Sequence, residues 1–511
     1  MKSNHYRPIF LNKEEVMPDD AKSIIHTPYT NKPAQGIMDG KRFLDSIQDD
    51  REIWYRGEKI KNVTTHPYFA GMAESLANIY DMQHEKKHQD VMTYVEDNGL
   101  RCSISYLRPT EKEHLVQRHK NTRFWSEQVH GMCGRLPDFC AAMTVGYVDL
   151  HDELAKLNPD LAKNAVNYYE YARDNDLCLS HALHDPCMDK SLSPKQDPDR
   201  CVHVVKERDD GVILRGARFN TIGPFCNDIL ISPTHTFTED EEEFAIWFMV
   251  PANAPGLKQI CREIFSNRDP LDHPMSARFD EIDTLVVLDD VFIPWERIFL
   301  YREPLAANRL FRGGVMAWAG DASSALTEVR FETLVTIGKL LAETSGIQER
   351  PHVQQALGEM CTYLTLLRKA IRAGHVDCHK SAGGHWQPEL FLDRRSLVTR
   401  VSERFCDLVE HIGTSSTIFN HTKEDWDNPG VAKYLQTYMR GRNSSAMDRH
   451  KITKLAWELT GDSYGRRQQL YERLHSGDAE MVKAGPGKSF DYGPGLERVS
   501  KLLDLQDTTI A

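Results

Sequence analysis

LDDVFIPWERIF, at residues 288–299, is rich in strand-forming residues and is interrupted by Pro294. Valine, isoleucine and phenylalanine favour strands, whereas proline bends a strand or ends it. We therefore expect the last strand of a β unit here, with a bend at Pro294.

The residues before this segment contain further strand signals. Residues 202–206 and 212–218 flank a turn with Asp209, Asp210 and Gly211, a pattern typical of a β-hairpin. Residues 178–305 are therefore predicted to form a central, β-barrel-like domain. Its other expected strands are 229–232, 244–250 and 285–288.

The chain on the N-terminal side of this unit is predicted to be mainly helical, as a domain of residues 37–177. It begins with a short helix from Gly40 and a hairpin candidate at 54–63. Residues 1–36 are polar and contain four prolines, so they form an N-terminal extension. This extension is either an arm that wraps a neighbouring subunit or a disordered tail.

Apolar residues at helical spacing dominate the chain after residue 305. Such stripes, on long helices joined by short links, predict a four-helix bundle with a tail, at 306–511. The predicted fold class is thus α+β: an N-terminal helical domain, a central β domain and a C-terminal bundle. The stripes lie at 326–340, 353–371, 397–412 and 452–459.

Composition limits the function. The chain has 511 residues and a net charge of -12, which suggests two or three structural units and argues against nucleic acid or an anionic membrane as partner. Its 11 cysteines are scattered, which fits a reducing compartment. Since no apolar run is long enough to span a bilayer, we expect a soluble, cytoplasmic protein.

Two short motifs are predicted to meet in one active site: GRLPDF at 134–139 and HALHDPCMDK at 181–190. Cys178, His181, His184 and Cys187 are evenly spaced and could suggest zinc. A strand would point them alternately to opposite faces, and zinc sites usually combine paired ligands from two segments. We therefore expect no metal.

The order of helices, β unit and bundle, together with 288–299, resembles the acyl-CoA dehydrogenase-like flavoproteins. Five collinear blocks are similar to the large, oxygenase component of the 4-hydroxyphenylacetate 3-monooxygenase family, which includes chlorophenol monooxygenases. These blocks are 39–67, 134–139, 181–190, 276–281 and 463–472.

This resemblance implies an FADH2-dependent aromatic monooxygenase that uses O2. Family members receive reduced FAD from a separate NAD(P)H-dependent reductase and hydroxylate a small aromatic ring, typically a phenol, through a C4a-hydroperoxyflavin. The flavin supplies the difficult chemistry, while the protein supplies position and charge. A homotetramer, a dimer of dimers, is the assembly that the resemblance implies.

The resemblance also assigns residues. Arg135 is the electrostatic anchor for the substrate hydroxyl, and His181 is its hydrogen-bond partner or base. Phe139 stands where the family has tyrosine, which leaves the choice among phenols, halophenols, aminobenzoates, heteroaromatics and carrier-bound rings open. Thr234 and His235 fall near the substrate. The flavin contacts are His181, Cys187, Met188, Asp189, Lys190, Thr221 or Ile222, Arg467, Tyr471 and Arg473.

The main alternative is a lyase that resembles 4-hydroxybutyryl-CoA dehydratase, with FAD and an iron–sulfur cluster. Such a cluster needs closely spaced thiolates, and Cys133 and Cys140 are too far apart for the Cys-x3-Cys pair expected there. A non-catalytic flavin-binding paralogue is a third reading, which the presence of Arg135 and His181 disfavours.

Overall fold

Strands of the central region form a ten-stranded sheet in the computed structural model, which describes residues 29, 32–186, 189–233, 236–389, 392–475, 477 and 479–505. Eight strands come from the central region, and a hairpin from near residue 55 adds two more. They are β1 (Glu52–Tyr55), β2 (Glu58–Ile60), β5 (Leu179–His184), β6 (His203–Arg208), β7 (Gly211–Asn220), β8 (Asp228–Ile231), β9 (Ile246–Pro251), β10 (Leu257–Cys261), β11 (Thr284–Pro294) and β12 (Ile298–Tyr301).

The sheet is open, so the prediction of a β-barrel-like domain is wrong in that respect. Its order is β12-β9-β8-β5-β7-β11-β10-β1-β2, with β6 paired to β7. The β1–β2 hairpin extends the sheet beyond β10, and no described pairing joins the two end strands, β12 and β2. The prediction missed this because the hairpin lies about 120 residues before the rest of the sheet.

The segment 288–299 belongs to a longer strand than predicted. Strand β11 also includes 285–288, and its pairing with β7 shifts register between Leu288 and Val291. Val286 and Leu288 are buried before the shift, and Val291 and Ile293 after it. The extra residue of this bulge thus keeps the apolar side chains on one face. Strand β11 ends at Pro294, and β12 follows after a short 3₁₀ turn.

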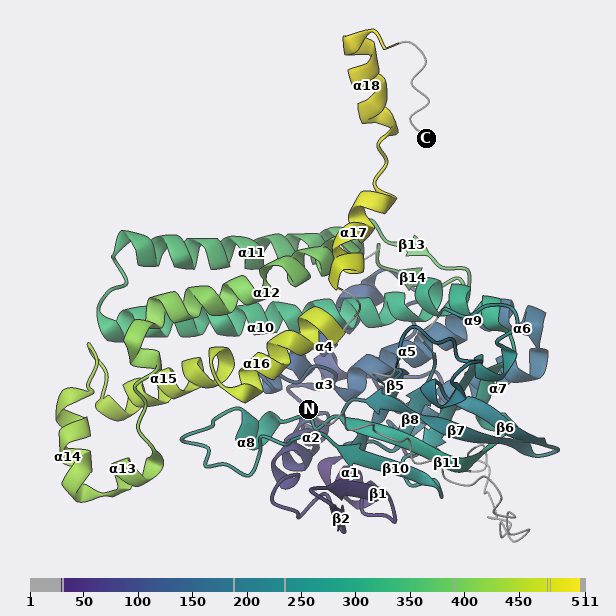
Figure 1. Cartoon of the computed structure of the whole chain (residues 1–511), viewed down its shortest axis with the longest axis horizontal. Helices are drawn as coiled ribbons and strands as arrows, with labels where there is room; N and C mark the ends of the chain where they lie inside the picture. Colours follow the sequence, from purple (N-terminus) through teal and green to yellow (C-terminus); the bar gives the residue numbers. More distant parts are fainter. Residues whose placement is uncertain are drawn as a thin grey trace, which may run out of the picture.

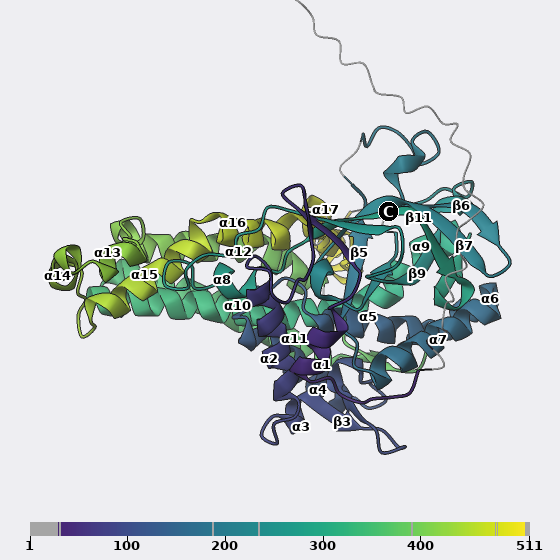
Figure 2. The ribbon, with the colours of Figure 1, turned by 90° about the horizontal axis from the view of Figure 1, so that it is seen from below.

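The N-terminal region is mainly helical, as predicted, with a small hairpin of β3 (Thr93–Val95) and β4 (Arg101–Ser103). Its helices include α1 (Gly40–Ser46), α2 (Ala70–Met82), α4 (Glu113–Gln128), α5 (Pro137–Asp149) and α7 (Pro159–Asp174). In Figure 2 these helices lie below the strands of the sheet, and two of them, α4 and α5, pack on the long helix at residues 316–345.

The predicted four-helix bundle is confirmed, and it consists of α10 (Met316–Ser345), α11 (Pro351–Val376), α12 (Leu392–Gly413) and α15 (Ala446–Thr460). Figure 1 shows α10, α11 and α12 running side by side away from the sheet. Phe331 and Phe405 stack inside the bundle with ring centroids 4.0 Å apart.

The chain continues after the bundle through α16 (Ser463–Leu470), a π-helical turn (Tyr471–His475), α17 (Ala479–Ser489) and α18 (Gly493–Leu503). Helix α17 packs on α12, whereas α18 projects from the body of the molecule (Figure 1). No helix in the described ranges is both long and apolar enough to cross a bilayer.

Candidate active site

The loop before α5 is fixed by a buried carboxylate. The backbone N–H groups of Gly134 and Arg135 donate to Oε2 of Glu281, at 2.5 and 3.3 Å. A Cβ at position 134 would lie 2.9 Å from the Tyr471 ring and 3.0 Å from Oε2 of Glu281, so only glycine fits without a shift. Pro137 then starts α5 at a position where no N–H is needed.

Arg135, Phe139 and His181 meet in the structure, from this loop, the first turn of α5 and the middle of β5. The Arg135 guanidinium carbon lies 4.9 Å from the centroid of the Phe139 ring. That centroid in turn lies 5.2 Å from the centroid of the His181 ring. Each of the three residues is only 5% exposed, so the group is shielded from solvent.

His181 is a neutral imidazole at ordinary pH. Burial, with the nearby positive charge of Arg135, lowers its pKa to about 3. Both of its ring nitrogens are buried and have no hydrogen-bond partner among the described residues. A buried group in this state gains from a ligand that can donate to one nitrogen and accept from the other.

The Arg135 guanidinium is paired with a residue that the sequence analysis did not single out. Its Nη1 atom lies 3.0 Å from Oε1 of Glu472, which also lies 3.6 Å from Nη2 of Arg330. Burial alone would raise the pKa of the Glu472 carboxyl, but Arg135 and Arg330 outweigh it and hold this pKa below its usual value.

The C-terminal block, which the resemblance assigns to flavin binding, lies beside Arg135 through Tyr471 and Arg467. The Tyr471 ring lies between two guanidinium groups, 5.3 Å from that of Arg135 and 4.7 Å from that of Arg467. Arg467 also pairs with Glu281 and Asp283. On the outer side, a hollow of about 520 Å³ is lined by Ser463, Arg466, Arg467, Leu470, Tyr471 and Leu474.

Arg473, predicted with them, instead pairs with Glu403 of α12. Asp189 and Lys190 are exposed, and Asp189 caps the turn at Ser191 through its carboxylate. Cys187, Met188, Thr234 and His235 lie outside the described residues.

Thr221 and Ile222 follow the end of β7, beside β5. Ala182 of β5 pairs with Asn220, and the hydroxyl of Ser180 donates to the carbonyl of Thr221. The Oγ1 atom of Thr221 and Nδ2 of Asn220 are buried without a hydrogen-bond partner among the described residues. These atoms and His181 are polar groups that a bound flavin could satisfy, so the site fits this cofactor.

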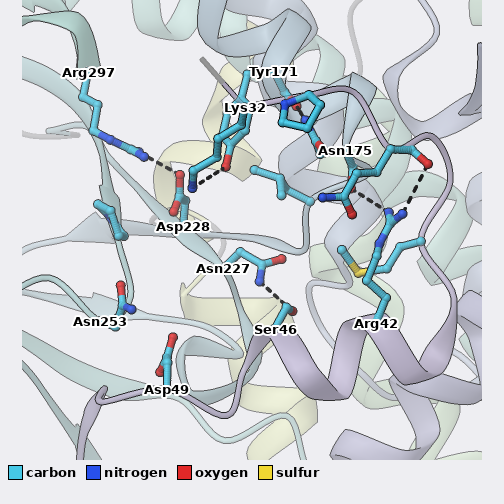
Figure 3. A pocket seen from close by; sticks show the side chains of 15 residues that line it. Lys32, Arg42, Ser46, Asp49, Tyr171, Asn175, Asn227, Asp228, Asn253 and Arg297 are labelled. Carbon is cyan, nitrogen blue, oxygen red and sulfur yellow. Dashed lines mark hydrogen bonds and ion pairs between the residues drawn. The ribbon is translucent and has the colours of Figure 1, made fainter. Parts of the chain in front are cut away.

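A second cavity, of about 420 Å³, lies between the segment near Lys32, α1, α7 and the sheet (Figure 3). Two of its charged side chains pair with each other, with Nη1 of Arg297 2.7 Å from Oδ2 of Asp228. No residue of the predicted site lines this cavity.

Sequence reasoning missed Glu281, Glu472, Arg330 and Arg395. Glu281 and Glu472 are each the last residue of a block that resembles the family, and this position was the one sequence signal that could have identified them. Arg330 stands between the buried Val329 and Phe331 on α10, but Glu328 and Glu332 flank these residues, so the local sequence does not mark Arg330 as buried. A buried charge at such a position requires a partner, but the sequence does not identify it.

The chain matches two family models. Residues 39–300 match the model described as 4-hydroxyphenylacetate 3-hydroxylase N terminal, and residues 324–504 match the corresponding C terminal model. Together they span most of the chain.

Two relatives agree with these matches. The oxygenase component of 4-hydroxyphenylacetate 3-monooxygenase from Thermus thermophilus is 33% identical over 471 residues, covering 91% of this chain and 97% of that protein. The oxygenase component of 4-nitrophenol 2-monooxygenase from a Rhodococcus species is 30% identical over 458 residues, covering 87% of each chain.

Two solved structures share the fold. An oxygenase component of 4-hydroxyphenylacetate 3-monooxygenase, complexed with FAD and 4-hydroxyphenylacetate, is similar with a TM-score of 0.86 and 32% identity, covering 91% of this chain and 98% of that one. A 4-hydroxybutyryl-CoA dehydratase from N. maritimus gives a TM-score of 0.85 at 20% identity, covering 93% and 96%. The second likeness concerns the fold alone.

Proposed function

This chain belongs to the 4-hydroxyphenylacetate 3-hydroxylase family, and we propose that it hydroxylates a phenol at the site formed by Arg135, Phe139 and His181. It is a flavin-dependent aromatic monooxygenase, the oxygenase component of a two-component system. Its fold is acyl-CoA dehydrogenase-like.

One observation carries the assignment of the site. A cation, an aromatic ring and a neutral imidazole meet in a buried place, and neither imidazole nitrogen has a hydrogen-bond partner in the part of the chain that the structure describes. A phenol offers complementary features, because its hydroxyl can donate and accept and its ring can pack on Phe139.

Each residue then has a defined role. Arg135 attracts the substrate oxygen electrostatically and favours loss of its proton, which makes the ring more electron-rich. His181 acts as a hydrogen-bond partner and not as a base, because a group with a pKa of about 3 takes up a proton poorly at neutral pH. Phe139 packs on the ring but offers no hydroxyl.

FAD is the cofactor, as in the relatives with FAD-complexed structures. We assign its binding to His181, Thr221, Ile222, Arg467 and Tyr471, with Cys187, Met188, Asp189, Lys190 and Arg473 as further contacts. FAD bound here in reduced form would supply the electrons that activate O2, and O2 would supply the oxygen atom that is transferred. The protein's own contribution is to hold the phenol, shield it from water and orient its hydroxyl.

A partner reductase and an aromatic substrate belong to such a two-component system. We propose that the reductase uses NAD(P)H and that this chain forms a homotetramer, a dimer of dimers. The projecting helix α18 supports assembly, because Val499, Leu502 and Leu503 are more than half exposed on it and an isolated helix of 11 residues is marginal in water. Light scattering on the purified chain tests this.

The function is tested by supplying photoreduced FAD and O2 to the chain with a panel of phenols, halophenols and aminobenzoates. Mass spectrometry should detect a product heavier by one oxygen atom, and labelling should appear from ¹⁸O2 but not from labelled water. Absence of any oxygenated product across the panel would contradict the proposal.

The dehydratase alternative is not favoured. Its support is a likeness of fold at 20% identity, whereas the monooxygenases match at 30% or more over most of the chain.

A further inference from the structure

Glu472 occupies an unusual position for a carboxylate. It lies on the π-helical turn that follows α16, and its side chain is only 2% exposed. Removing a carboxylate from water costs free energy, so a buried carboxylate is stable only where nearby cations or hydrogen-bond donors compensate that cost. The turn therefore has to meet positive charge from other parts of the fold.

Three arginines from three separate elements surround this residue. Arg135, from the loop before α5, lies 3.0 Å from the carboxylate, and Arg330, from α10, lies 3.6 Å from it. Arg395, from α12, donates through Nη2 to the backbone carbonyl of Glu472 at 3.2 Å. All three are at most 7% exposed, so three positive charges and one negative charge share a shielded space.

The charged residues next to Glu472 and its three arginines form ion pairs among themselves. Glu281 holds the backbone of Gly134 and Arg135 and pairs with Arg467, which also pairs with Asp283. Tyr471, packed between Arg135 and Arg467, adds a phenol that burial keeps protonated by raising its pKa. Glu472 thus pairs directly with the Arg135 guanidinium, whereas Glu281 accepts from the Arg135 backbone and acts on the guanidinium only through its charge.

We propose that Glu472 positions Arg135 and, as its counter-ion, sets how readily a phenol bound beside Arg135 loses its proton. This inference rests on the function proposed above. With Glu472 in place, Arg135 is held between Phe139 and Tyr471 and its field at the substrate is reduced. Without the negative charge, the same space would carry a larger net positive charge and would stabilise a phenolate more strongly.

The ionisation of a bound phenol can be read without turnover. 4-Nitrophenol absorbs visible light as its phenolate, so titrating its complex with the full-length protein and oxidised FAD gives the pH midpoint of the bound ligand. In Glu472→Gln we expect this midpoint to move to lower pH by about one unit. In Glu472→Asp, which keeps the charge, it should stay near the wild-type value.

Two further variants test whether a shift of the midpoint is specific to the charge of Glu472. Glu458→Gln alters another buried carboxylate, which accepts from the backbone N–H groups of Met275 and Ser276, at 2.7 and 2.9 Å. It should lower thermal stability and leave the midpoint unchanged. Arg330→Gln removes a cation that shares Glu472, so it should move the midpoint to higher pH and tests the idea even if Glu472→Gln does not fold.

The outcomes separate the two proposals. If the wild-type chain does not bind 4-nitrophenol or any phenol of the panel, the proposed function itself is contradicted. If the wild type binds the probe but neither Glu472→Gln nor Arg330→Gln moves its midpoint, the site stands and the role of Glu472 is overturned.

Discussion

The ring of Phe139 lies 5.2 Å from the ring of His181, centroid to centroid, with an angle of 60° between their planes. This places the residue that departs from the family pattern directly against the imidazole proposed to bind the substrate hydroxyl. A hydroxyl added at position 139 would therefore enter the proposed site, and not a remote part of the core.

Phe139→Tyr should change substrate preference towards 4-hydroxyphenylacetate. The new hydroxyl adds one hydrogen bond at the site, worth about 1 kcal/mol, or roughly a fivefold change in relative kcat/KM. Competition between phenols, analysed by product ratio, measures this. Phe139→Leu, which adds no hydroxyl, is the control, and an identical ranking in all three proteins would contradict a role for this position in selectivity.

Arg135→Ala should abolish product formation while FADH2 is still oxidised and hydrogen peroxide accumulates. Loss of a charge that stabilises the reacting oxygen costs about a hundredfold or more in rate. Product and peroxide are measured together in single-turnover reactions. Arg404→Ala, which removes an exposed arginine paired with Glu359 on the bundle, should hydroxylate normally. Normal hydroxylation by Arg135→Ala itself would mean that the anchor lies elsewhere.

Much of the fold follows from periodicity. The four bundle helices could be predicted because their apolar stripes repeat over many turns, and the 203–220 hairpin because its turn residues are strong signals. The bulge at Asp289 and Asp290 was harder to predict, because it divides the apolar pattern of one strand into two segments that look like separate strands. The open sheet was not predicted because long-range strand order leaves no local pattern.

For the site, too, contacts between residues far apart in the sequence could not be predicted from local patterns. The resemblance indicated that Arg135 and His181 would meet, and their neighbourhood with Phe139 agrees with it. Arg135 and Glu472 are 337 positions apart in the sequence, and the residues around either one do not indicate that the two would pair. Buried charge pairs of this kind depend on tertiary packing, so they become visible only in the structure.

His181→Gln should make the protein less sensitive to acid. In the folded state the His181 pKa is about 3, against an unfolded value near 6.5, so the unfolded chain binds more protons between these values. The free energy of unfolding of the wild type therefore falls as pH drops below about 6.5, by up to about 1.4 kcal/mol per pH unit from this residue. Glutamine does not titrate and removes that contribution.

Urea unfolding at pH 7.5, 6 and 5 measures the effect as a difference between wild type and variant. The partly buried His184 and the buried His450 also have lowered pKa values, but both are present in the two proteins, so most of their contribution cancels in the comparison. Parallel pH dependences in the two proteins would show that His181 is not held neutral by its surroundings.

Glu281→Gln should destabilise the protein and loosen the loop that carries Arg135. Glu281 is buried and accepts from the N–H groups of Gly134 and Arg135 while it pairs with Arg467. Breaking a buried pair of this kind costs about 3 to 5 kcal/mol, and Arg467 keeps Asp283 as a partner, which places the expected loss at the lower end.

The pH dependence identifies the cause of that loss. Burial opposes ionisation of Glu281, but Arg467 outweighs it and lowers the carboxyl pKa to about 2, below its unfolded value. Its stabilising contribution is therefore complete above about pH 4.5 and is lost as pH falls towards 2. The gap in unfolding free energy between wild type and Glu281→Gln should narrow from pH 6 to pH 4, in urea titrations with the exposed-pair variant Glu359→Gln as reference. A gap that stays constant over this range would mean that the carboxylate acts through packing and not through its charge.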